Sequence, residues 1–327
     1  MTTEQQNNRT TEQQNNRTTE RKTIQFFMLV TNRDTLLACH SIKSYEKLIP
    51  VLTNYDWKLV VYCNSLKDEF KKTYVEEWKK LDYVEIVDNV NYVNPDDLIP
   101  GTSVYSEEGW PKRVEGKFEP CGVVWTREFR KFASDFWVTV DADFEILSPD
   151  FVLMAFKMLE DQSNLVAVAS DYNGPCYYFD TYSQENIYGM ERYNTWFCIY
   201  KKEAQKCKTS LFYYQEVHYK LRFSFDETAK FQYDLREQFG YKMKAVDKKY
   251  RRSFIHYGSF SKNCSLDTYK KICTYRRISI LSHRGLFGSS IIVDKVIRRL
   301  FKIIHKRLYT KQSIERGRLN YQSKLDE

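Results

Sequence analysis

Two aspartates one residue apart, Asp141 and Asp143, are the residues of this sequence whose types and spacing most directly suggest chemistry. They follow five apolar or β-forming residues at 136–140, so they are expected at the carboxyl end of a buried strand. In open α/β sheets that edge binds ligands, and paired carboxylates there can hold Mg²⁺ or Mn²⁺ together with the phosphates that the cation carries. A solvated turn after a strand is the alternative explanation of the same residues.

The elements that must position this pair alternate along the chain. Apolar runs predict strands, and helical periodicity with start and stop signals predicts the segments between them. Strands are expected at 24–30, 57–63, 83–87, 136–140, 165–169, 196–200 and 241–246. Helices are expected at 35–49, 67–81, 121–135, 151–161 and 226–239, with a loop at 91–117 and an aromatic, polar stretch at 171–195. Such alternation predicts a parallel α/β sheet.

The two ends of the chain differ in composition from its body. The octapeptide Thr-Thr-Glu-Gln-Gln-Asn-Asn-Arg occupies 2–9 and again 10–17, and it has no apolar face, so residues 1–21 are expected to form a disordered leader. Residues 241–327 hold 22 Lys or Arg against 6 Asp or Glu, which leaves the first 240 residues mildly acidic. With 42% hydrophobic and 29% charged residues, the chain as a whole is not a disordered protein.

The basic end includes a predicted amphipathic helix at 290–309, within an extension at 263–327. A helix with six positive charges on its polar face is typical of binding to an anionic membrane surface. Packing of the same helix on the rest of the protein is an alternative. RNA binding is a weaker third explanation, because no RNA-binding motif accompanies the charge.

The strand that runs into the aspartate pair, preceded by a βαβ half and followed by a mixed half, resembles the GT-A-fold glycosyltransferases and their Asp-x-Asp motif. The resemblance covers about residues 22–262. Its other marks are Thr31-Asn32-Arg33 after the first strand, Phe225-Asp226-Glu227 before a helix, and a late His256 in a turn-like segment at 254–259. It implies a Rossmann-related α/β/α sandwich with a mixed central sheet, a nucleotide-sugar half at 22–143 and an acceptor half at 144–262.

The resemblance implies a metal centre. Asp143 would ligate the cation, Asp141 would bind the ribose or complete the metal's shell, and His256 would supply a third ligand. The expected cofactor is Mn²⁺ or Mg²⁺, and a neutral imidazole suits Mn²⁺. A histidine packed for structural reasons is the alternative for His256.

The resemblance also implies a nucleotide-sugar site. Thr31 and Arg33 would line the nucleotide pocket, and Asp88, which ends the third strand, would contact the base or ribose. Arg127 and Arg130, one helical turn apart, would face the diphosphate, although an ordinary surface pair explains them equally well.

On the acceptor side, Asp226 is the expected general base if the anomeric carbon inverts, with Glu227 as the second candidate. The alternative is that Asp226 or Ser224 caps the following helix. Tyr177, Tyr178 and Tyr193 belong to an aromatic stretch that is expected to stack on acceptor sugars. Core and loop packing explains at least half of the rings in that stretch.

We therefore expect a metal-dependent glycosyltransferase that moves a sugar from a nucleotide-sugar donor to a hydroxyl acceptor, on a glycan or a lipid-linked saccharide. One alternative is a Mg²⁺-dependent nucleotidyltransferase, although the glycine-rich phosphate loop of that class is missing after the first strand. A non-enzymatic module that binds anionic surfaces is another. No nucleic-acid partner is expected. Without a spanning segment or signal peptide, a cytoplasmic protein is expected, peripheral on the cytoplasmic membrane face if 290–309 binds lipid.

Overall fold

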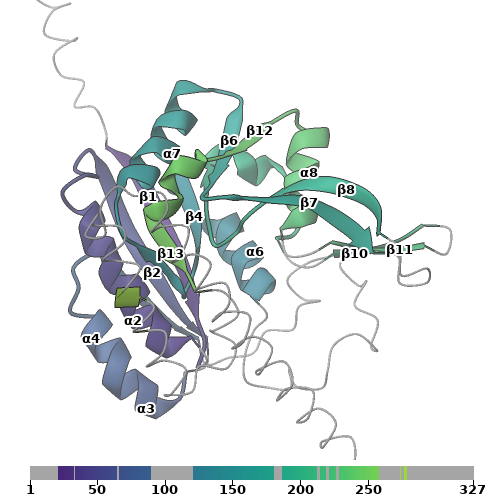
Figure 1. The fold of residues 1–327 in the computed structure, drawn as a ribbon. Helices are drawn as coiled ribbons and strands as arrows, with labels where there is room; N and C mark the ends of the chain where they lie inside the picture. Colours follow the sequence, from purple (N-terminus) through teal and green to yellow (C-terminus); the bar gives the residue numbers. More distant parts are fainter. Residues whose placement is uncertain are drawn as a thin grey trace, which may run out of the picture.

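The computed structural model describes residues 21–32, 34–64, 66–89, 121–179, 186–211, 214–218, 221–225 and 228–257, together with residues 273, 276 and 277. These residues form a central sheet with helices on both faces (Figure 1). The predicted leader apart from Arg21, the loop at 91–117 and the helix at 290–309 lie outside the described residues.

The central sheet has seven strands in the order β12-β6-β9-β4-β1-β2-β3. Strand β9 runs antiparallel to both of its neighbours, β4 and β6, while the other neighbouring pairs are parallel. The predicted mixed α/β sheet is therefore confirmed, and strands from both predicted halves of the chain share it. The strands are β1 (Lys22–Val30), β2 (Tyr55–Asn64), β3 (Val84–Asn89), β4 (Phe136–Asp141), β6 (Leu165–Ala169), β9 (Phe197–Lys201) and β12 (Lys242–Ala245).

Burial on both faces explains why the central strands read as continuous apolar runs. In β1, Phe26 and Met28 belong to one core cluster, whereas Phe27 and Leu29 point to the opposite face and belong to another. Alternate side chains of a strand point to opposite faces, so β1 contributes to both layers of core. The strand assignments at 24–30, 57–63, 83–87 and 136–140 agree with the structure to within about two residues.

Two helical layers cover the sheet. The first core cluster includes residues of α2 (Thr35–Ser44), α4 (Glu76–Trp78) and α7 (Asp150–Asp161). The second includes residues of α6 (Cys121–Lys131) and α8 (Ala229–Glu237). The described residues thus form the predicted α/β/α sandwich, with the sheet between two apolar layers.

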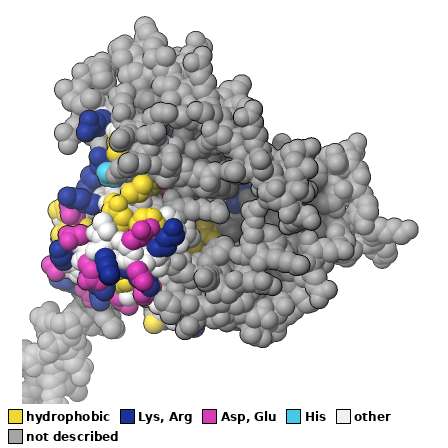
Figure 2. Space-filling model, turned by 90° about the horizontal axis from the view of Figure 1, so that it is seen from below, with side chains coloured by type: hydrophobic (Ala, Val, Ile, Leu, Met, Phe, Trp, Pro, Cys, Tyr) yellow, Lys and Arg dark blue, Asp and Glu magenta, His cyan; other side chains and the backbone are white. Residues whose placement is uncertain are grey.

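Some predicted helices differ in detail from the observed ones. The helix expected at 67–81 runs as α3 (Asp68–Phe70), a π-helical turn (Lys71–Val75) and α4, and α2 continues as a 3₁₀ turn (Tyr45–Leu48). A 3₁₀ or π turn alters the hydrogen-bond spacing without interrupting the apolar face, so periodicity alone does not reveal it. Directly after α4, Lys79 and Lys80 pair with Glu76 and Glu77 of that helix, and the face seen in Figure 2 mixes both signs of charge.

Strand pairs outside the central sheet were largely missed by the sequence. The aromatic stretch at 171–195 contains an antiparallel hairpin, β7 (Tyr172–Phe179) with β8 (Asn186–Tyr193), and a second pair joins β10 (Tyr214–His218) to β11 (Leu221–Phe225). Ribbons of two strands need no continuous apolar run, which explains why the pattern was not recognised. The turn expected around His256 is wrong for 254–256, which form β13 (Phe254–His256) against β5 (Phe144–Ile146).

Two further expectations concern the whole chain. The six described cysteines carry free thiols. Among the described residues, we find no helix with the length and apolar composition needed to cross a bilayer. Nothing in the described part of the chain supports the predicted membrane association.

Candidate metal centre

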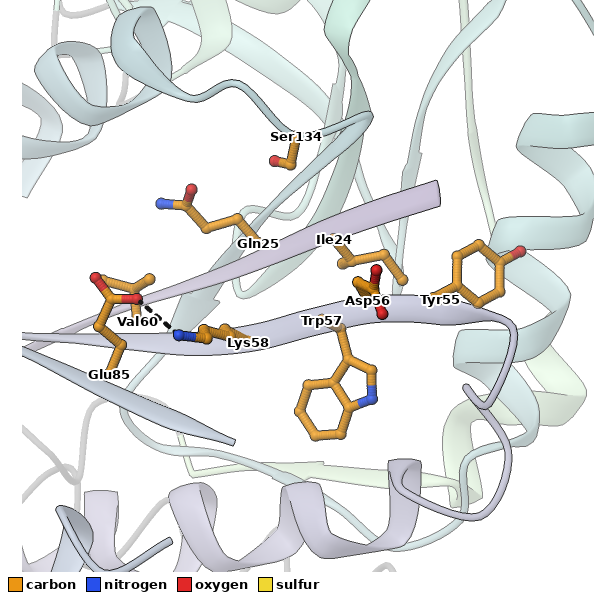
Figure 3. Close-up of a pocket in the computed structure, with 9 residues that line it drawn as sticks. All are labelled: Ile24, Gln25, Tyr55, Asp56, Trp57, Lys58, Val60, Glu85 and Ser134. Atoms are coloured by element: carbon orange, nitrogen blue, oxygen red, sulfur yellow. Dashed lines mark ion pairs between the residues drawn. The ribbon is translucent and has the colours of Figure 1, made fainter. Parts of the chain in front are cut away.

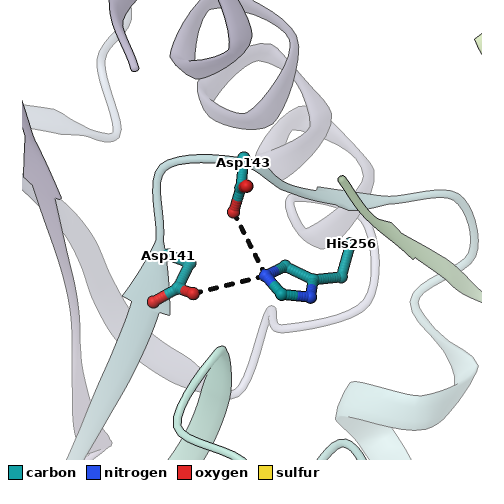
Figure 4. Close-up of side chains that lie close together, drawn as sticks. All are labelled: Asp141, Asp143 and His256. Atoms are coloured by element: carbon teal, nitrogen blue, oxygen red, sulfur yellow. Dashed lines mark ion pairs between the residues drawn. The ribbon is translucent and has the colours of Figure 1, made fainter. Parts of the chain in front are cut away.

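Asp141, Asp143 and His256 converge at the carboxyl end of β4 (Figure 4). Nε2 of His256 lies 3.3 Å from Oδ2 of Asp141 and 3.3 Å from Oδ1 of Asp143. One ligand atom from each side chain can be chosen so that all three lie within 4.8 Å of one another. The three residues that the sequence proposed as metal ligands are therefore brought together by the fold.

The backbone of β4 and its neighbours places the two aspartates. Asp141 pairs in register with Leu29 of β1, and its N–H donates to the carbonyl of Trp196 at 2.9 Å. The chain then turns over Ala142, which is buried, and enters β5 directly after Asp143. The short turn leaves both carboxylates at the strand end, where the adjacent strands of a parallel sheet expose backbone groups to a ligand.

His256 reaches this place through the ladder between β5 and β13. Its partner in register is Phe144, the residue that follows Asp143. Beyond the ladder, the N–H of Tyr257 donates to the carbonyl of Asp143 at 3.0 Å. The imidazole also stacks on Trp196, with ring centroids 3.9 Å apart and an interplanar angle of 24°. Backbone pairing and ring stacking together fix the direction of Nε2.

The three side chains differ in how far they are exposed to solvent. Their exposed fractions are 5% for Asp143, 13% for His256 and 29% for Asp141. A carboxylate as buried as that of Asp143 requires a compensating charge or hydrogen bond. The open side of the group is therefore the side of Asp141.

The donor set fits a divalent cation. Two ligands at right angles, each about 2.1 Å from a cation, lie about 3.0 Å apart, which is close to the distances from Nε2 to the carboxylate oxygens. Carboxylates are the preferred protein ligands of Mg²⁺ and Mn²⁺, and an imidazole nitrogen in the set favours Mn²⁺ over Mg²⁺.

The imidazole of His256 balances the charge of the two carboxylates. Burial lowers the pKa of His256, but the hydrogen bonds and charges of Asp141 and Asp143 outweigh burial and raise this pKa to about 9. At neutral pH the imidazolium accordingly holds the two carboxylates together. A metal ion bound by Nε2 has to replace this proton, since only the neutral imidazole is a ligand.

A further carboxylate belongs to the same region and was not predicted as a site residue. Asp34 accepts hydrogen bonds from the hydroxyl of Thr31 at 2.6 Å and from the N–H of Thr31 at 3.2 Å. Burial, aided by the negative charges of Asp143 and Asp141, raises the pKa of Asp34 to about 6 against the effect of these hydrogen bonds. The available signal was its position in the turn after the first strand, because β1 lies beside β4.

Thr31, predicted to line the nucleotide pocket, lies in this turn next to the carboxyl end of β1. Asp88 lies in β3 at the same edge of the sheet, where it forms an ion pair of 2.7 Å with Lys71. Arg33 lies outside the described residues. The nucleotide roles of Thr31, Arg33 and Asp88 stay predictions.

The side chains of Arg127 and Arg130 bind different partners, although the two residues are one turn apart on α6. The guanidinium of Arg127 lies 5.5 Å from the ring centre of Tyr62 and donates to its hydroxyl. Tyr62 pairs with Leu29, which pairs with Asp141, so the backbones of Tyr62 and Asp141 are two strand spacings, or about 10 Å, apart. Arg130 instead donates to the carbonyl of Lys208 at 2.8 Å.

The residues predicted for the acceptor are only partly described. Tyr193 is 9% exposed and its ring packs against Tyr172 with centroids 5.4 Å apart. The positions of Asp226 and Glu227 and the side chains of Tyr177 and Tyr178 lie outside what the structure describes. The general base and the acceptor platform stay predictions.

A pocket at the opposite edge of the sheet is separate from this group (Figure 3). Its volume is about 600 Å³, and its lining includes Gln25, Lys58 and Glu85, the last two forming an ion pair of 3.6 Å. Gln25 lies four residues before Leu29, the partner of Asp141, so the pocket is about 13 Å away along the strands. Ligands of open α/β sheets bind at the carboxyl ends of the strands, where Asp141 lies, and not at the amino ends, where this pocket lies.

Comparisons with known proteins give distant structural matches. A glucosyl-3-phosphoglycerate synthase from Mycobacterium tuberculosis, in complex with Mn²⁺, uridine diphosphate and phosphoglyceric acid, is 14% identical with a TM-score of 0.42, over 81% of this chain and 79% of that chain. The mannosyltransferase PcManGT from Pyrobaculum calidifontis, in complex with GDP-Man and Mn²⁺, is 13% identical with a TM-score of 0.34, over 59% and 48%. Both similarities are distant, with TM-scores below 0.5 and identities below 25%.

Another match is a 4-diphosphocytidyl-2C-methyl-D-erythritol synthase from Anaerococcus prevotii, 11% identical with a TM-score of 0.42, over 79% of this chain and 100% of that chain. For two of the matched structures, this chain spans about half of the other protein's length, 48% and 54%. No protein-family model matches the sequence, and no curated protein matches it. At these identities and TM-scores the matches carry no argument about this chain, and the case for a function comes from the site itself.

Proposed function

We propose that this protein is a metal-dependent glycosyltransferase that uses a nucleotide-sugar donor. The observation that carries the proposal is the convergence of Asp141, Asp143 and His256 on one point at the carboxyl end of β4. An Asp-x-Asp pair at the end of a central strand, completed by a distant histidine, offers three ligands to a divalent cation and leaves its remaining positions to substrate oxygens.

Asp141, Asp143 and His256 hold Mn²⁺ or Mg²⁺ in this proposal. When bound, the cation supplies positive charge that offsets the charge developing on the diphosphate leaving group. Arg127 serves the diphosphate from the α6 side, because its side chain is held over Tyr62 two strands from Asp141. Arg130, which donates to a backbone carbonyl, has a lesser part in binding.

Thr31 and Asp34 form the wall of the same site at the end of β1, and Asp88 contributes at the end of β3. The pKa of Asp34 is about 6, so at neutral pH Asp34 is mostly an acceptor-only carboxylate, which can accept from a ribose or sugar hydroxyl. Asp226, or Glu227, deprotonates the acceptor hydroxyl if configuration inverts. The acceptor is a hydroxyl of a glycan or a lipid-linked saccharide, which Tyr177, Tyr178 and Tyr193 contact.

A screen of nucleotide sugars for Mn²⁺-dependent release of nucleoside diphosphate tests the proposal directly. Release that is lost in Asp143→Ala and kept in the control Asp161→Asn supports it; Asp161 is an exposed carboxylate at the end of α7. Mn²⁺ binding is measured in parallel by the loss of the free-ion signal in electron paramagnetic resonance. Equal Mn²⁺ affinity in the wild type and in Asp143→Ala would show that Asp143 is not a metal ligand, and would contradict the proposed function.

A further inference from the structure

The ladder that carries His256 to Asp143 contains one buried charge. Strands β5 and β13 pair over three positions only, and Glu145 occupies the middle position opposite Ile255. The side chain of Glu145 is 1% exposed. A carboxylate removed from water to this extent requires charge compensation and hydrogen bonds, so its partners determine how firmly this short ladder is held.

Two side chains compensate Glu145. The hydroxyl of Tyr257 donates to Oε2 at 2.6 Å. The guanidinium of Arg276 donates through Nε to both oxygens, at 2.8 and 3.0 Å, and through Nη2 to Oε1 at 2.8 Å. A planar guanidinium that engages both oxygens of a carboxylate fixes direction as well as distance.

Tyr257 connects this ion pair to the metal ligands. It follows His256 in the chain, and its N–H donates to the carbonyl of Asp143 while its hydroxyl donates to Glu145. Glu145, in turn, lies two residues after Asp143. Arg276 is therefore connected to Asp143 and His256 by direct contacts through Glu145 and Tyr257.

Arg276 comes from the segment predicted as a C-terminal extension, beyond the predicted end of the catalytic domain at 262. Cys273, three positions earlier and also helical, has its Sγ 3.9 Å from Nε2 of His40 in α2. Cys273 and Arg276 thus contact α2 and β5, respectively. Helix α2 also binds β5 directly, since Ser41 donates to the carbonyl of Phe144 and the N–H of Ile146 donates to Ser44 at 3.0 Å.

We propose that Arg276 is a positioning residue for the metal centre. By clamping Glu145 it holds β5 and β13 in the register that places Nε2 of His256 beside Asp143. This inference rests on the proposed function, because it assumes that Asp141, Asp143 and His256 bind a metal ion. Without the guanidinium, Glu145 loses the charge partner that compensates its burial, and an uncompensated buried charge loosens a pairing of only three positions.

The experiment compares Arg276→Gln with Arg277→Gln in the full chain. Arg277 is the neighbouring residue and is exposed, so its replacement removes the same charge without touching Glu145. The Mn²⁺ dissociation constant is measured by electron paramagnetic resonance, and the visible spectrum of bound Co²⁺ reports the coordination geometry. We expect Arg276→Gln to bind Mn²⁺ about 10- to 100-fold more weakly with an altered Co²⁺ spectrum, and Arg277→Gln to match the wild type.

Tyr257→Phe is measured alongside, because loss of one hydroxyl is compatible with folding even where loss of Arg276 is not. It is expected to weaken Mn²⁺ binding by about fivefold, as one hydrogen bond to a charged group is removed. Unchanged Mn²⁺ affinity in folded Arg276→Gln, or in Tyr257→Phe where Arg276→Gln does not fold, overturns the inference while leaving the proposed function intact. If the wild type binds Mn²⁺ no better than Asp143→Ala, the proposed function fails and this inference fails with it.

Discussion

The indole of Trp196 stacks on the imidazole of His256, with the ring centroids 3.9 Å apart. Trp196 also offers its backbone carbonyl to the N–H of Asp141, so one residue supports two of the three candidate ligands. Because the ring sets the plane of the imidazole, Trp196→Leu is expected to weaken Mn²⁺ binding by about three- to tenfold, corresponding to roughly 1 kcal/mol for an aromatic pair. Calorimetric titration with Mn²⁺ measures this change.

A suitable control is Trp57→Leu. Trp57 packs on Phe26 in the first core cluster and pairs in register with Ile24, near the amino end of β1 and away from Asp141. That variant is expected to lose stability but to keep its Mn²⁺ affinity. Equal affinities of all three proteins would show that stacking does not position His256.

The raised pKa of Asp34 predicts that the stability of the folded protein changes with pH. The pKa of Asp34 is raised from 3.8 in a reference peptide to about 6 in the folded protein, because burial and the nearby carboxylates disfavour its charge. The neutral form is therefore favoured by folding: the advantage is fully present below about pH 4 and is lost as the pH rises through 6. Asp34→Asn keeps an acceptor for Thr31 without a charge, so it should stabilise the protein at pH 7 and above.

The expected gain at pH 7 is at most about 3 kcal/mol in the free energy of unfolding, and close to zero at pH 4 and below. Urea unfolding of both proteins between pH 3.5 and 8, with a chelator present, measures it. A difference between the two proteins that is the same at every pH would show that the charge of Asp34 is not the cause.

Binding of a divalent cation should stabilise the folded protein by mass action. At Mn²⁺ concentrations about 100 times the dissociation constant, the expected gain is about 2.7 kcal/mol, provided that the unfolded chain does not bind the ion. Thermal unfolding with Mn²⁺ and with a chelator measures the gain in the wild type. Asp143→Asn should lose it, and an unaltered shift in that variant would place the ion elsewhere.

We expect the two arginines of α6, Arg127 and Arg130, to differ in their contribution to donor binding. Arg127 is held above Tyr62 and forms an ion pair of 2.7 Å with Glu128, whereas Arg130 bonds the carbonyl of Lys208, so we expect Arg127 rather than Arg130 to serve a diphosphate near Asp141. Arg127→Ala is expected to raise the KM for the nucleotide sugar by about tenfold or more, the range for a charge-assisted hydrogen bond, and Arg130→Ala to change it little. Steady-state kinetics decide, and equal effects of the two changes would contradict the assignment.

A buried amide fixes the chain just before Trp196. Gln232 of α8 accepts from the N–H of Tyr193 at 2.9 Å and donates to its carbonyl at 3.0 Å. Gln232→Ala leaves both backbone groups buried without these partners and should cost about 2–4 kcal/mol in the free energy of unfolding. Gln238→Ala, an exposed control just beyond α8, should cost less than about 0.5 kcal/mol in the same urea experiment.

The sequence by itself determined the central elements and the aspartate pair. Each depends on neighbours in the chain: a strand buried on both faces must be apolar throughout, and the first polar residues after it must stand at the sheet edge. This is why the predicted strands ending at Val30 and Val140 agree with the structure, and why the sequence alone indicates Asp141 and Asp143 as a candidate site.

The tertiary structure decided what surrounds that pair. Tyr257 and Glu145 are 112 positions apart, and only the register between β13 and β5 determines that His256 faces Asp143. The burial of Asp34 and the clamp of Arg276 on Glu145 likewise depend on which elements pack together. Local periodicity carries information about burial within one element, whereas contacts between distant elements follow from sheet order and packing, which no single segment encodes.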